Sequence, residues 1–118
     1  MKNILLGLVF LISLPASAAL IQGGSVDLEK GVILLEVSYS GGCKDHEFSL
    51  QIGGCLESMP AQCSAKLIHK RNGDFCEMYI NRTIEISLED AELNDPYYSG
   101  ASLGITGDAD SRVTIELP

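Results

Sequence analysis

The strongest constraint on the fold is a long stretch in which apolar and polar residues alternate one by one. Over residues 76–88 every even position is apolar except Arg82, and the positions between them are mostly polar. A period of two is typical of a β-strand that places one face against a core. Because Arg82 interrupts this pattern, we expect a bulge or the edge of a sheet at that point.

Shorter stretches show the same alternation. They cover residues 33–39, 48–52 and 112–117, while residues 65–70 form a shorter, ambiguous candidate. Clusters of glycine, asparagine, aspartate and proline separate these stretches, as expected of turns. Beyond one possible helical turn at residues 88–93, the sequence has no helical period. It therefore predicts an all-β fold, a small antiparallel β-sandwich or barrel stapled by disulfides.

The first 18 residues have the pattern of a secretory signal peptide. Lys2 precedes an apolar run at residues 4–14, and Ala16-Ser17-Ala18 offers the small residues of a cleavage site. The run is shorter than the roughly 17–25 residues that a membrane-spanning helix needs. We expect cleavage after Ala18, which leaves residues 19–118 as a single β domain that is secreted or periplasmic.

All four cysteines follow the predicted cleavage site. An exported chain folds in an oxidising compartment, where an even number of cysteines is typical of disulfide bonds. Two bridges would supplement the limited hydrophobic core of a domain of this size.

The order of strands in the middle of the chain predicts which cysteines meet. We expect a meander in which a strand at 46–52, a loop at 53–64 and a strand at 65–70 lead through a turn at 72–74 into the long third strand. One end of such a meander gathers the following side chains: Cys43, His46, His69, Asp74 and Cys76.

The remaining two cysteines, Cys55 and Cys63, flank the loop at the opposite end. The expected bridges are therefore Cys43–Cys76 and Cys55–Cys63. Any other pairing would have to span the length of a strand, beyond the roughly 7 Å that a disulfide permits between Cα atoms.

The same cluster permits a different interpretation as a metal site. Cys43, His46, His69 and Cys76 would supply two thiolates and two imidazoles, which suit zinc or copper. If the cysteines instead form a bridge, His46, His69 and Asp74, with Asp45 nearby, remain as metal ligands or as a pH-sensitive cluster. The ordinary alternative is that the two histidines pair across strands and hydrogen-bond to turn carbonyls.

The charge balance disfavours two classes of partner. The chain has 16 acidic and eight basic residues. From residue 83 onward it has eight acidic residues and one basic residue, Arg112. Nucleic acids and anionic membranes both require a basic surface. The acidic surface is then either a solvated face or a site for a cationic partner.

The sequence lacks the motifs of common hydrolases and of phosphate-binding loops, so we do not expect an enzyme. The expected function is that of an exported, non-catalytic binding module whose partner is an unknown protein or small ligand. The alternative is a metal-binding or metal-sensing protein that uses His46 and His69 to hold zinc or copper.

A family resemblance covers roughly residues 41–88. The motifs that carry it are Gly41-Gly42-Cys43-x-x-His46-x-Phe48-x-Leu50, Glu57-Ser58-x-Pro60, Leu67-x-His69 and Gly73-Asp74-x-Cys76-Glu77. This pattern resembles that of small exported bacterial proteins of uncharacterised function. The resemblance implies that the five clustered side chains belong together and that Cys43 pairs with Cys76, with Cys55–Cys63 as an addition in this chain. It implies no activity.

Overall fold

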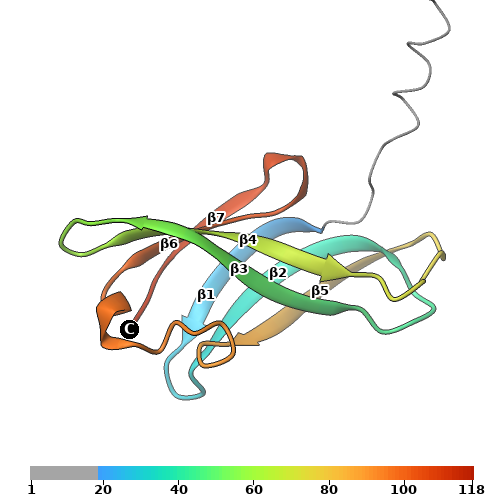
Figure 1. Cartoon of the computed structure of the whole chain (residues 1–118). Coiled ribbons are helices and arrows are strands. Elements are labelled where there is room, and N and C mark those ends of the chain that lie inside the picture. Colours follow the sequence, from blue (N-terminus) through green and yellow to red (C-terminus); the bar gives the residue numbers. More distant parts are fainter. Residues whose placement is uncertain (1–18) are drawn as a thin grey trace, which may run out of the picture.

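Two β-sheets enclose the core of the protein. The structure is a computed structural model that describes residues 19–118 (Figure 1), so the predicted signal peptide lies outside the described residues. The strands are β1 (Leu20–Asp27), β2 (Val32–Gly41), β3 (Glu47–Leu56), β4 (Gln62–Lys70), β5 (Met78–Ser87), β6 (Ser102–Thr106) and β7 (Arg112–Glu116). The first sheet has the order β1-β2-β5 and the second has the order β3-β4-β6-β7.

The predicted all-β class is confirmed, because both sheets contribute alternate side chains to a shared buried cluster. The first sheet contributes Ile21, Ile33, Leu35, Val37, Ile84 and Ile86, and the second contributes Ala65, Leu67, Leu103, Ile105 and Ile115. Pairing is antiparallel throughout these strands except between β4 and β6, which run parallel. The fold is thus a small sandwich with one mixed sheet.

The expected three-stranded meander is wrong in one respect. β3 and β4 do form an antiparallel hairpin, but β5 pairs with β2 in the other sheet. Residues 71–77 separate β4 from β5. This connection is longer than a tight hairpin turn, and it lets the chain cross the roughly 10 Å between packed sheets.

Two strands were missed at the level of sequence. β1 contains Gly23-Gly24 and has a bulge between Ile21 and Gly23, so its alternation is interrupted. β6 spans five residues, of which the middle three are all buried. Leu103 and Ile105 alternate with Ser102, Gly104 and Thr106, but a run with two large apolar residues around a glycine is too short to be told from a loop by its period.

Arg82 marks a sheet edge, as one of the two sequence interpretations proposed. It pairs with Val37 in continuous register, and β5 is an outer strand of the first sheet. The guanidinium donates to the Tyr39 hydroxyl at 3.1 Å and lies 5.8 Å from the centre of the Phe48 ring on β3. A charged side chain on the inward face of an edge strand discourages pairing with a further strand.

Both expected disulfides are present. Cys43–Cys76 joins the connection after β2 to the connection before β5, and Cys55–Cys63 joins directly opposed residues of β3 and β4. The loop expected at 53–64 is shorter than predicted, because β3 continues to Leu56 and β4 begins at Gln62. The second bridge therefore lies within the paired strands of the hairpin.

The two bridges differ in how strongly they constrain the unfolded chain. They close intervals of 33 and 8 residues, for which the chain-entropy relation gives about 4 and about 2.5 kcal/mol. We expect the pair of substitutions Cys43→Ser and Cys76→Ser to lower the free energy of unfolding more than Cys55→Ser with Cys63→Ser does. Urea unfolding followed by circular dichroism measures both, and equal losses would contradict the expectation.

Candidate functional site

The five side chains predicted to gather at one end of the sandwich do so. Cys43 and His46 lie on the connection between β2 and β3, and His69 lies near the end of β4. Asp74 and Cys76 lie on the connection that crosses from β4 to β5. The site thus joins two connections that each cross from one sheet to the other, and we call these five residues the anchor cluster.

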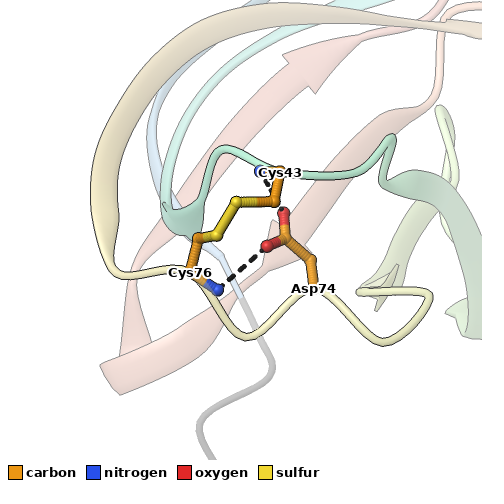
Figure 2. Close-up of side chains that lie close together, drawn as sticks. All are labelled: Cys43, Asp74 and Cys76. Carbon is orange, nitrogen blue, oxygen red and sulfur yellow. Dashed lines mark hydrogen bonds between the residues drawn. A yellow bond between two sulfur atoms is a disulfide. The ribbon is translucent and has the colours of Figure 1, made fainter.

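Asp74 is the centre of the anchor cluster, with 1% of its surface exposed. Its Oδ2 accepts hydrogen bonds from the backbone N–H groups of Gly42, Cys43 and Lys44 at 3.0–3.1 Å. Its Oδ1 accepts from the Cys76 N–H at 3.0 Å, so the carboxylate bonds to both halves of the disulfide (Figure 2). Successive backbone N–H groups that converge in this way form an anion-binding nest.

His46 completes the set of donors to this carboxylate. Its Nε2 lies 2.7 Å from Asp74 Oδ2, and the His46 side chain is 1% exposed. This side-chain bond, followed by the backbone N–H groups, holds the pKa of Asp74 well below its usual range and outweighs the opposing effect of burial. Asp74 is therefore a buried anion whose charge is compensated by hydrogen bonds.

The hydrogen-bonded chain continues from His46 to His69. Nδ1 of His46 lies 2.6 Å from Nε2 of His69, so one of these two nitrogens carries the shared proton. The rings stack at 26°, and His69 also lies flat on Phe48 with the ring centres 4.5 Å apart. Tyr39 contacts both imidazoles. The two histidines thus pair with each other, as the ordinary alternative expected.

These contacts occupy the groups that a metal ion would need. The Sγ atoms of Cys43 and Cys76 and a carboxylate oxygen of Asp74 lie within 4.8 Å of one another. In the bridged form, however, the sulfurs are not thiolates, which are the form that binds metal. Both nitrogens of His46 are hydrogen-bonded. Metal binding would therefore require the bridge or one of these bonds to break.

Three contributions to this end were missed at the level of sequence. Gly41 was assigned to a turn, yet a side chain there would meet His46 and Asp74. Arg71 donates to the backbone carbonyl of Asp74 at 2.8 Å. Asp45 was expected near the site through its side chain, but the contact it makes is between its backbone carbonyl and the Asn72 amide. Only the Gly-Gly pair carried a signal, namely that the chain passes close to another group.

The two disulfides indicate an oxidising compartment. Within residues 19–118 the structure has no helix with the length and apolar character needed to cross a membrane. Comparisons of the chain with protein-family models, with curated proteins and with solved structures found no match. The geometry of the described residues is therefore the basis for the functional argument.

Asp74→Asn tests the role of the buried anion, with the exposed Asp45→Asn as the matched control. The folded-state pKa of Asp74 lies below the unfolded value of about 3.9, so the carboxylate stabilises the fold above that pH. Its contribution is lost as the pH falls through the folded-state pKa. We expect Asp74→Asn to lower the urea midpoint at neutral pH while Asp45→Asn leaves it unchanged.

The difference between wild type and Asp74→Asn should be constant above about pH 5 and should narrow below about pH 4. A difference that does not change between pH 5 and pH 3 would show that Asp74 is not the titrating group.

Gly41→Ala tests how closely the anchor cluster packs against β2. A Cβ at Gly41 would lie 2.6 Å from His46 Nε2 and 2.8 Å from Asp74 Oδ2, whereas a Cβ at Gly54 would meet nothing within 4 Å. We expect Gly41→Ala to cost about 1–3 kcal/mol, as overpacking usually does. Gly54→Ala is the control, and equal stabilities of the two variants in urea would contradict the close packing.

Proposed function

We propose that the protein is an exported, non-catalytic binding module that contacts its partner through loops at the ends of a rigid β scaffold. The signal-peptide pattern and the oxidising compartment support export. The scaffold is cross-linked near both ends, and binding residues are commonly placed on loops that a rigid scaffold positions.

The observation that carries the proposal is how the side chains at the loop ends are used. The ionisable side chains of the anchor cluster form hydrogen bonds with backbone N–H groups and with one another. Large apolar side chains remain exposed beside each bridge: Phe75 and Met78 near Cys76, and Leu56 and Met59 near Cys55. Apolar groups gathered on ordered loops are typical of surfaces that dock a partner.

The alternative is a zinc- or copper-binding protein that uses His46 and His69. It requires the imidazoles to exchange their present hydrogen bonds for metal ligation. The binding module requires no rearrangement, and we favour it for that reason.

Capture from an envelope extract by the immobilised, oxidised protein tests the proposal. The variants are Phe75→Ser and Met59→Ser, with Thr83→Ser on the exposed face of β5 as the matched control. We expect a specific captured species to be lost in one of the apolar variants and retained in the control. Equal capture by all three variants would contradict a binding surface at the loop ends.

Titration of the same oxidised preparation with zinc and with copper separates the two functions. We expect no binding at submicromolar metal. Imidazole nitrogen resonances of the wild type report ligation directly, so the result does not depend on whether His46→Ala and His69→Ala fold. Submicromolar binding to the wild type that shifts these resonances would overturn the proposal in favour of the metal-binding function.

A further inference from the structure

A groove of about 480 Å³ lies at the end of the sandwich opposite the anchor cluster. It is lined by the tip of the β3–β4 hairpin and by the short helical turn η1 (Pro96–Tyr98), which precedes β6. Met59 is 98% exposed and Tyr97 is 53% exposed at its walls. Figure 1 shows the hairpin tip and the connection between β4 and β5 at opposite ends of the molecule.

The walls of this groove, which we call the tip groove, are held by local bonds. The Cys55–Cys63 bridge closes the hairpin directly before the tip, and Ser58 Oγ donates to the Pro60 carbonyl at 2.7 Å. On the other wall, Asp95 Oδ1 accepts from the Tyr97 N–H at 2.8 Å. Exposed side chains on an ordered backbone bind a partner with a smaller loss of entropy.

The charged side chains at the tip groove itself are acidic. Among the lining residues that the structure describes, Glu57 is the one with a charged side chain. Asp95 lies directly before η1, is exposed, and accepts from the Tyr97 N–H through its Oδ1. Three of the basic residues, Lys44, Lys70 and Arg71, lie at the opposite end beside the anchor cluster, and Arg112 lines a separate hollow beside Leu56. The two carboxylates therefore favour a cationic group at the groove.

We propose that the tip groove binds a segment of another protein that combines lysine or arginine with apolar side chains. This inference rests on the proposed binding function and names the class of its partner. A cationic head group can lie over the Tyr97 ring and pair with the carboxylates of Glu57 and Asp95. The apolar stem and its neighbours can pack on Met59, whose flexible thioether adapts to different shapes.

An NMR titration of the ¹⁵N-labelled, oxidised protein tests the inference. The probe is a capped peptide that alternates lysine and leucine, and the control peptide alternates glutamate and leucine. We expect the lysine peptide to shift the amide resonances of residues 57–61 and 95–99, and to bind more weakly at about 0.3 M salt, where screening is strong. The glutamate peptide should leave these resonances unchanged.

Three variants locate the contact. Met59→Ser and Tyr97→Ser should each weaken binding of the lysine peptide by at least about fivefold. Tyr79→Ser, an equally drastic change on β5 at the opposite end, should leave the affinity unchanged. All three side chains are exposed, so the fold does not depend on them.

Other outcomes overturn the inference. Equal binding of the two peptides, or unchanged affinity in both groove variants, would show that the tip groove does not select a cationic segment. Shifts confined to the Phe75 end would refute this inference and leave the binding module standing, because the capture experiment also tests that end through Phe75→Ser. Retention on uncharged phosphatidylcholine vesicles that is lost in Met59→Ser and Tyr97→Ser would assign the groove to a lipid surface instead.

Discussion

The buried carboxylate of Asp74 is the interaction on which this end of the molecule depends. Five N–H groups converge on its two oxygens, four from the backbone and one from His46. These groups lie on the β2–β3 connection and on the β4–β5 connection, so the Asp74 side chain holds the two connections together. Removing the acceptor would leave buried donors without a partner, which is more costly than the loss of one exposed bond. The same hydrogen bonds lower the pKa of Asp74, because they stabilise its charged form.

The Cys43–Cys76 bridge and the Asp74 carboxylate constrain the same two segments in different ways. The bridge acts mainly on the unfolded chain, whereas the carboxylate acts in the folded state by satisfying backbone donors. His46 extends the second constraint to His69, and thus from the connections to the end of β4. The polar residues of this end thereby serve the scaffold. Exposed apolar side chains lie on the loops, and those of the tip groove lie beside the carboxylates of Glu57 and Asp95.

The sequence was sufficient to predict the class of fold, both disulfides and the membership of the anchor cluster. Alternation identified β2 and β5, because each has one face in the core and one in solvent. It failed for β1, where glycines and a bulge interrupt the period, and for β6, whose alternation covers five residues around a central glycine. The partner of β5 was also not predictable, because a period of two shows which face is buried but not which strand lies alongside. His46 and His69 meet because β3 and β4 form a hairpin in which Phe48 lies opposite His69, and the sequence did predict that hairpin.

Amide hydrogen exchange of the oxidised and the reduced protein tests most directly whether Asp74 organises this end. The amides of interest are those of Gly42, Cys43, Lys44 and Cys76, which donate to its carboxylate. If the carboxylate holds the two connections, these amides stay protected after the Cys43–Cys76 bridge is reduced, and they lose protection in Asp74→Asn with the bridge intact. If the bridge alone holds them, reduction exposes all four amides to exchange at the rate of an open loop, and Asp74→Asn leaves them protected.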